Sequence, residues 1–92
     1  MAVKVEIPSP LREHTGGQTE VAVAGATVQA ALDDLVRQFP SIGPKLFDGG
    51  KLRPYINVFL NDENIHHLQK LETPVKAGDE ISIVPAIAGG AH

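Results

Sequence analysis

The fold is decided by residues 27–39, TVQAALDDLVRQF, which carry the one long helical pattern of this chain. Thr27 is a suitable N-cap, and the helix must end before Pro40. We interpret the Asp33–Asp34 pair, which falls between apolar positions, as part of the solvated outer side of this helix. The apolar residues recur at helical spacing and are Val28, Ala31, Leu32, Leu35, Val36 and Phe39. The stretch therefore predicts a single amphipathic helix.

A strand pattern precedes this helix. Residues 3–7 alternate apolar and charged side chains, until Pro8 and Pro10 end regular pairing. Turn-forming residues follow at 14–18, and residues 19–23 have the pattern of a returning strand. The chain is therefore expected to begin with a hairpin.

The region after the helix returns to strand periodicity. Residues 41–53 contain several glycines and prolines, which predict a short helical turn around Leu46–Phe47 and then a loop. Residues 54–60 alternate between two faces and are expected to form a central strand. We further expect a short strand over residues 65–68 and a last strand over residues 80–85.

These elements limit the possible architectures. A doubly wound sheet needs several crossover helices, whereas this chain offers one. Two hairpin-like regions flanking one helix predict an α+β, ubiquitin-like β-grasp, with a mixed sheet of four to five strands over the main helix. We place the β-grasp domain at residues 1–85 and a flexible C-terminal tail at residues 86–92.

Composition excludes several function classes. The chain has 92 residues, a formal net charge of -3 and no cysteine, and its basic residues form no run. We therefore expect no nucleic-acid partner, no disulfide and no thiol nucleophile. No apolar stretch approaches the roughly 20 residues that span a bilayer, so we expect no membrane partner and cytoplasmic residence.

The chain shows no pattern for a bound cofactor or metal. His66 and His67 are adjacent, so on a strand they would point to opposite faces and could not share one metal. The glycine pairs match no phosphate-binding spacing, and the neighbouring acids Asp62 and Glu63 lie in a predicted turn. We expect no metal site, no bound cofactor and no catalytic side chain.

The C-terminal sequence carries the most informative motif. A turn at Gly78-Asp79-Glu80 is followed by the apolar strand, then Pro85, and finally Gly89-Gly90. In this order the motif resembles the end of the ThiS/MoaD family of ubiquitin-like sulfur carriers. An earlier segment, Ile7-Pro8, Leu11-Arg12 and residues 14–18, is most similar to the CysO branch, which serves cysteine biosynthesis.

This resemblance implies a specific chemistry for the chain end. An adenylyltransferase/sulfurtransferase similar to ubiquitin-activating enzyme would use ATP to adenylate the Gly90 carboxyl, and a sulfur donor would convert it to a thiocarboxylate. Ile87, Ala88 and Gly89 would thread the active site of each partner, because glycine and small residues suit a narrow channel. A cysteine-synthase-like synthase would accept the sulfur. The chain would be a protein cosubstrate, with ATP bound only by its partner.

Two residues follow the diglycine. Ala91 and His92 leave Gly90 in an ordinary amide, so the chain resembles a precursor. By family resemblance, a JAMM-type zinc metalloprotease would cleave between Gly90 and Ala91. The alternatives are that the dipeptide is an expression remnant, or that the protein is a degenerate relative that is never activated.

A candidate partner-binding surface lies on the strands. Phe59 and Val84, with Tyr55, are predicted on the faces opposite the core residues, and exposed apolar residues often mark an interface. The resemblance implies that partner enzymes bind the sheet beside the tail. Alternatively, Phe59 packs under the loop at residues 41–53.

Other functions remain open at the level of sequence. The same tail would suit the small subunit of molybdopterin synthase or a sulfur carrier for the thiamin thiazole. A ubiquitin-like modifier, joined through Gly90 to a lysine, or a plain interaction module is the third class. The final sulfur acceptor is not encoded in this chain, because specificity would reside in the synthase.

Overall fold

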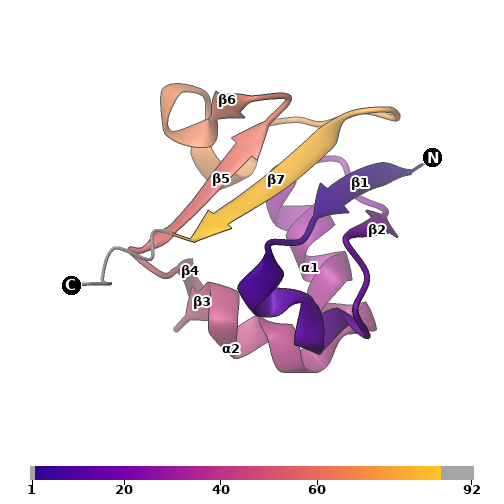
Figure 1. Ribbon diagram of the computed structural model, residues 1–92. Helices are drawn as coiled ribbons and strands as arrows, with labels where there is room; N and C mark the ends of the chain where they lie inside the picture. The colour runs from indigo at the N-terminus through magenta and orange to yellow at the C-terminus, as the bar shows by residue number, and fades with distance from the viewer. Residues whose placement is uncertain (1, 86–92) are drawn as a thin grey trace.

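A five-stranded mixed sheet forms the framework of the protein, as seen in a computed structural model that describes residues 2–85. The strand order is β2-β1-β7-β5-β6. Only β1 and β7 run parallel, and the other neighbouring pairs are antiparallel (Figure 1). The strands are β1 (Val3–Glu6), β2 (Glu20–Val23), β5 (Ile56–Leu60), β6 (Glu63–Asn64) and β7 (Glu80–Pro85).

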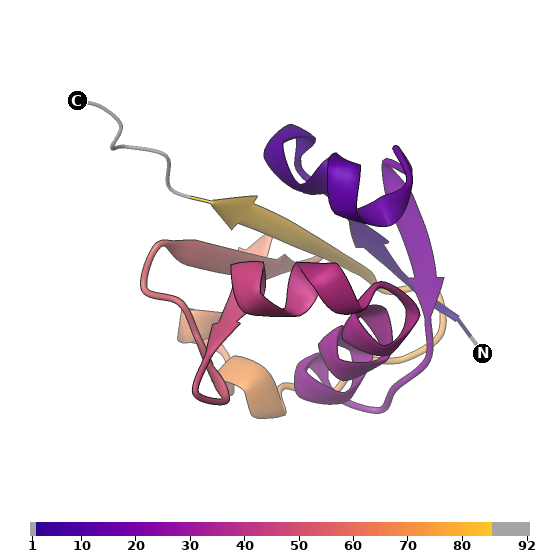
Figure 2. The same cartoon turned by 90° about the horizontal axis from the view of Figure 1, so that it is seen from below.

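The main helix, α1 (Val28–Gln38), packs against one face of this sheet. Thr27 caps it, since its hydroxyl oxygen accepts a hydrogen bond from the Ala30 N–H at 3.1 Å. Figure 2 shows α1 and the short α2 (Gly43–Leu46) together on one side of the sheet. The sheet and α1 enclose a core that includes Val5, Ile7, Leu32, Leu35, Val58, Ile81 and Ile83.

The architecture confirms the predicted fold class. One hairpin, β1–β2, precedes α1, and a second antiparallel unit, β5–β6, follows it. β7 inserts between β1 and β5 and closes the mixed sheet. This is the ubiquitin-like β-grasp. The proposed domain boundary after residue 85 stays a prediction, because the structure describes nothing beyond it.

The segment at residues 41–53 differs in part from its prediction. The expected helical turn is present as α2, preceded by the 3-10 turn η2 (Pro40–Ile42). The expected loop is instead a small hairpin, β3 (Phe47–Asp48) with β4 (Lys51–Leu52). Gly49 and Gly50 make its turn with φ of 64° and 86°, a conformation that glycine adopts readily.

The predicted strand at residues 65–68 is wrong. Residues Ile65–His67 form a 3-10 turn, η3, and a second turn, η4, follows at Lys70–Glu72. The Asn64 side chain accepts a hydrogen bond from the His66 N–H at 2.9 Å, which caps η3 and turns the chain out of the sheet. On the side of β5 away from β7, the pairing strand is therefore the two-residue β6. The N-terminal connection also contains a 3-10 helix, η1 (Ser9–Thr15).

The prediction of a solvated Asp33–Asp34 pair is wrong for one of its members. Asp33 is exposed, but Asp34 is 9% exposed. An Asp34 carboxylate oxygen accepts the Ala24 N–H at 2.9 Å, because the chain leaving β2 passes beside this turn of α1. The carboxylate therefore satisfies a backbone donor in the β2–α1 connection.

Within residues 2–85, no helix has both the length and the apolar character needed to cross a membrane.

Candidate functional site

The site predicted from the sequence starts where β7 ends. β7 is an inner strand, paired through Glu80–Ser82 with β1 and through Ile81–Pro85 with β5. Its last described residue, Pro85, lies opposite Ile56 at the start of β5. Pairing with β1 over its first half and with β5 up to Pro85 thus fixes the position of β7 in the sheet.

The turn before β7 is built around Asp79. Gly78 has φ of 90°, a left-handed conformation that disfavours residues with a Cβ. An Asp79 carboxylate oxygen accepts the Lys76 N–H at 2.9 Å, and the other accepts the Asn61 side-chain amide at 3.1 Å. The hydrogen bond from the Lys76 backbone, followed by that from Asn61, lowers the pKa of Asp79.

Asn61 connects this turn to the end of β5. The side-chain oxygen of Asn61 accepts the Glu80 N–H at 3.0 Å, and the backbone N–H of Asn61 donates to the Glu80 carbonyl at 2.9 Å. Asn61 and Asp62 have φ of 49° and 74°, so the β5–β6 turn uses two left-handed residues. The Lys4 N–H adds a bond to the Asp79 carbonyl at 3.1 Å. The start of β7 is therefore held by both neighbouring strands.

The outer face of the sheet is acidic over β1 and β2. Partial burial raises the pKa of Glu80, and the charges of Glu20 and Glu6 raise it further. The Ser82 hydroxyl donates to Glu6 at 3.1 Å and links β7 to β1 on this face.

The same face is more apolar over β5 and β7. Phe59 lies opposite Ser82 and Val84 lies opposite Asn57, so Phe59 and Val84 are diagonal neighbours. Val84 is 44% exposed and Tyr55 is 46% exposed, whereas Phe59 is partly buried.

The alternative position for Phe59 is not observed. Phe47 and Leu52, which belong to the segment at residues 41–53, are among the partly buried side chains that pack against the core, and Phe59 is not. The structure places Phe59 on the outer face together with Val84.

The remaining predicted residues lie outside the part of the chain that is described. They are the adenylation residue Gly90, the threading residues Ile87, Ala88 and Gly89, and Ala91 at the processing site. Among residues 2–85, no group of three or more histidine, cysteine or acidic side chains is placed to hold a metal ion.

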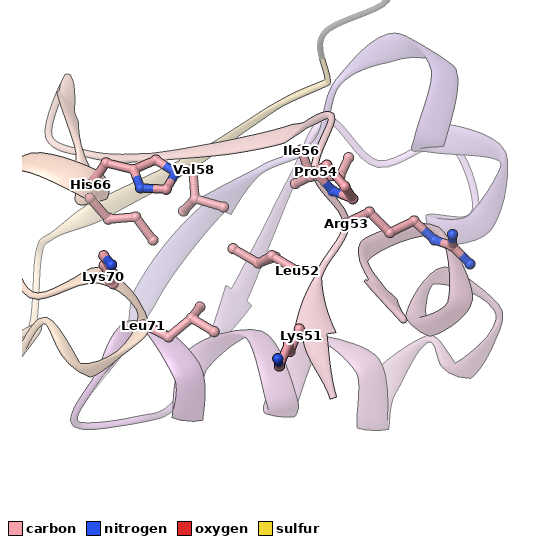
Figure 3. Close-up of a pocket in the computed structure, with 10 residues that line it drawn as sticks. Lys51, Leu52, Arg53, Pro54, Ile56, Val58, His66, Lys70 and Leu71 are labelled. Atoms are coloured by element: carbon pink, nitrogen blue, oxygen red, sulfur yellow. The ribbon is translucent and has the colours of Figure 1, made fainter. Parts of the chain in front are cut away.

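Sequence reasoning missed a groove on the helical side of the sheet. It has a volume of about 420 Å³ and lies between the β4–β5 connection and the turns η3 and η4 (Figure 3). Leu52, Leu71 and Val58 contribute apolar surface, and Lys51 and Lys70 contribute ammonium groups. No local sequence pattern predicts it, because its walls belong to two segments, residues 51–58 and 65–71, that only the fold brings together.

Comparison with known proteins agrees with the motif at the end of β7. The model of the ThiS family matches residues 5–90. The chain belongs to the ThiS family. The matched range ends at Gly90, so Ala91 and His92 lie beyond the part shared with the family model.

Relatives of this ThiS-family chain include sulfur carriers and a modifier. It is 41% identical to the sulfur carrier protein CysO of Mycobacterium tuberculosis over 93 residues, which cover 98% of this chain and all (100%) of CysO. A crystal structure of the Amycolatopsis orientalis BexX/CysO complex matches with a TM-score of 0.90 and 45% identity, covering 97% of this chain and 100% of that one. The solution structure of small archaeal modifier protein 1 from Methanosarcina acetivorans matches with a TM-score of 0.88 and 35% identity. The match covers 97% of this chain and 96% of that one.

Proposed function

We propose that this chain is a sulfur carrier, whose Gly90 carboxyl is converted to a thiocarboxylate after Ala91 and His92 have been removed. The observation that carries the proposal is the full-length similarity to CysO at 41% identity, together with a family match that ends at Gly90. The chain would act as a cosubstrate, and the reacting group would be its own C-terminus.

The proposed chemistry starts from a poor electrophile. A carboxylate resists attack, so an adenylyltransferase similar to ubiquitin-activating enzyme would transfer AMP from ATP to Gly90 and release pyrophosphate. A sulfur donor would then displace AMP and leave the thiocarboxylate. Every catalytic group and the ATP site would belong to the partner.

The geometry of β7 supports this division of labour. The strand is anchored at its start by Asn61 and Asp79 and along its length by β1 and β5. Five residues, 86–90, would reach roughly 17 Å if extended, at about 3.4 Å per residue. That reach would carry Gly90 into a partner while the domain docks outside. Glycine at 89 and 90 would pass a narrow channel, since it lacks a Cβ.

Maturation would precede activation. As long as Ala91 and His92 are present, the carboxyl available for adenylation belongs to His92. We propose that a JAMM-type zinc metalloprotease cleaves the bond between Gly90 and Ala91.

The domain would dock through the apolar part of the outer face. Val84 is exposed there with Phe59 as its diagonal neighbour, and the exposed Tyr55 lies in the turn just before β5, whose first residue pairs with Pro85. An interface around Phe59, Val84 and Tyr55 would therefore bring the tail to the partner's active site.

We further propose that the sulfur passes to a cysteine-synthase-like enzyme, which would use it to form cysteine or a related thio compound. The support is the similarity to CysO proteins along the whole chain. A molybdopterin-synthase subunit and a thiazole sulfur carrier would use the same tail chemistry, so the acceptor enzyme has to be found by experiment.

A reconstituted loading reaction tests the proposal. The chain ending at Gly90 is incubated with its activating enzyme, ATP and a sulfide source, and the mass of the product is measured by mass spectrometry. We expect one oxygen to be replaced by sulfur in this chain, and no replacement in the Gly90→Ala variant or in the chain that still ends at His92. Full loading of the Gly90→Ala variant would contradict the proposal.

A second candidate is a protein modifier joined to lysines through Gly90. The observation that favours it is the similarity to small archaeal modifier protein 1. Under this alternative, cell extracts would contain slowly migrating conjugates that resist thiol reductants and disappear in the Gly90 deletion.

A further inference from the structure

We propose that Asn57 is a specificity-determining residue of the docking surface, and that its side-chain amide bonds to an uncharged peptide group of the enzyme that activates Gly90. The inference rests on the proposed function, because it takes the apolar part of the outer face as the surface that meets this enzyme. It adds one polar contact to that surface and names the chemistry of the group on the other side.

Asn57 is the one polar side chain of β5, whose sequence is Ile-Asn-Val-Phe-Leu. Ile56, Val58 and Leu60 are buried in the core, so the alternation along the strand turns Asn57 and Phe59 to the outer face. Asparagine is depleted in strands. At this position it therefore lowers the local preference for the strand, and such a departure from local consistency is expected at functional positions.

The fold makes no use of the Asn57 amide. Within residues 2–85 this side chain forms no hydrogen bond, unlike its polar neighbours on the two strands: Ser82 donates to Glu6, and Asn61 donates to Asp79. An asparagine side chain carries one C=O acceptor and an NH₂ group with two donor hydrogens. All of this hydrogen-bonding capacity is available to a partner.

The surroundings of Asn57 on the outer face carry no charge. It lies opposite Val84 in the ladder of β5 with β7, and Phe59 follows two positions later on the same face. Ser82, which lies opposite Phe59, is uncharged as well. Val84 is 44% exposed, whereas Asn57 and Phe59 are partly buried. An enzyme that covers Val84 would therefore remove the neighbouring amide from water.

The place of Asn57 in the sheet favours the enzyme that acts on Gly90 as this partner. β7 ends at Pro85, which lies opposite Ile56, the residue before Asn57 (Figure 1). The five residues 86–90 span at most roughly 17 Å, at about 3.4 Å per residue. An enzyme that takes Gly90 into its active site must therefore approach the end of β7 closely, and Asn57 lies at that end.

A covered amide selects its partner through its hydrogen bonds. One polar group left unsatisfied in an interface weakens binding by roughly five- to hundredfold. A main-chain peptide group is uncharged and offers one N–H and one C=O, which complement the C=O and NH₂ of Asn57. A lysine would leave the donors of the amide unpaired, and a carboxylate would leave its acceptor unpaired. The surface therefore favours an enzyme that presents a peptide group beside apolar side chains.

Binding and sulfur loading, measured separately on the chain that ends at Gly90, test the inference. Asn57→Leu keeps the approximate size of the side chain and makes the surface more apolar, so docking by apolar contact alone would become tighter. We expect instead that the Kd for the activating enzyme rises by at least about fivefold. The kcat of loading at saturating carrier should not change. Asn57→Asp removes the donors and should raise the Kd at least as much.

Ala22→Leu is the matched control, because it adds the same side chain on β2 of the same face and should leave the Kd unchanged. Melting curves check that every variant is folded. Binding that depends on Asn57 without sulfur loading would support this contact and contradict the proposed function.

Four results would overturn the inference. An equal or lower Kd for Asn57→Leu would mean that docking is apolar only, and a lower Kd for Asn57→Asp would assign a cationic group to the enzyme. A reduced kcat with an unchanged Kd would place the effect of Asn57 outside docking. Absence of binding by the wild-type chain would reject the surface itself.

Discussion

The Asn61 side-chain amide donates a hydrogen bond of 3.1 Å to the Asp79 carboxylate. This bond joins the turn after β5 to the turn before β7. Asn61 also accepts the Glu80 N–H at 3.0 Å, so one side chain contacts both the residue before β7 and the first residue of β7. The Gly-Asp-Glu turn of the family motif thus has a structural role here. It sets the start of β7 and thereby the register of this strand between β1 and β5.

Replacement of Asp79 by Asn should make stability less dependent on pH in acid. The pKa of Asp79 is lowered below its ordinary value of 3.8 in the folded state. Its stabilising contribution is therefore fully present above that value, and it is lost as pH falls through the lower folded pKa. The melting temperature of wild type should exceed that of Asp79→Asn at pH 7, and the difference should shrink toward about pH 2. Asp62→Asn, in the neighbouring turn, makes the same change of side chain and charge and is the comparison variant. A difference that stays constant with pH would contradict the account.

Replacement of Glu80 by Gln should have the opposite sign. The pKa of Glu80 is raised above its ordinary value of 4.5 by partial burial and by Glu20 and Glu6, so the ionised form is disfavoured in the fold. Its ionisation therefore costs stability above that value and costs nothing well below it. Glu80→Gln should raise the melting temperature at pH 7, with the gain disappearing at low pH. Glu63→Gln, on the exposed β6, serves for comparison. A lower melting temperature at pH 7 for Glu80→Gln would show that the pKa direction is wrong.

Adjacent aspartates of α1 should differ sharply in their effects. Asp34→Ala removes the acceptor of the Ala24 N–H and should cost about 1–3 kcal/mol in the free energy of unfolding. Asp33→Ala should change it by about 0.5 kcal/mol or less, because Asp33 is exposed. Urea denaturation of both variants measures the difference. Equal costs would mean that the bond to Ala24 contributes little.

These aspartates also show which features of the fold can be predicted from local sequence and which cannot. The spacing of Val28 to Phe39 predicts helix α1 and its buried face correctly, since periodicity is a local property. Asp34 also contacts Arg37 and Gln38 of its own helix, as helical spacing allows, but its backbone partner Ala24 follows β2, and nothing in the helical pattern contains that contact. The wrongly predicted strand at residues 65–68 has a different cause, because the bond from the His66 N–H to the Asn64 side chain joins residues two positions apart, and this local cap starts a 3-10 turn where the residue pattern suggested a strand.

The candidate site also has parts that the sequence predicts and parts that it does not. Alternation along β5 and β7 was sufficient to put Phe59 and Val84 on the outer face, because their neighbours Val58 and Ile83 are apolar and buried. The groove between Lys51 and Lys70 depends on how β4 and η4 approach each other, which local sequence does not encode. The residues from Ile87 to Ala91 stay predictions, supported by the motif and the family.

A charge on the outer face should impair docking without unfolding the domain. Val84→Lys places an ammonium group among the exposed apolar residues and should reduce the rate of sulfur loading by about tenfold, which corresponds to about 1.4 kcal/mol. Ala22→Lys makes the same change on β2 of the same face and should load at the wild-type rate. Circular dichroism checks that both variants are folded. Equal loading by the two variants would exclude the surface around Val84 as the docking site.

The intact mass of the protein from its own host, expressed without a C-terminal tag under conditions that demand sulfur assimilation, tests the central claim most directly. We predict a chain that has lost Ala91 and His92 and carries sulfur in place of one oxygen at Gly90. A population that consists entirely of unmodified chains ending at His92 would contradict the proposal that this protein is a processed sulfur carrier.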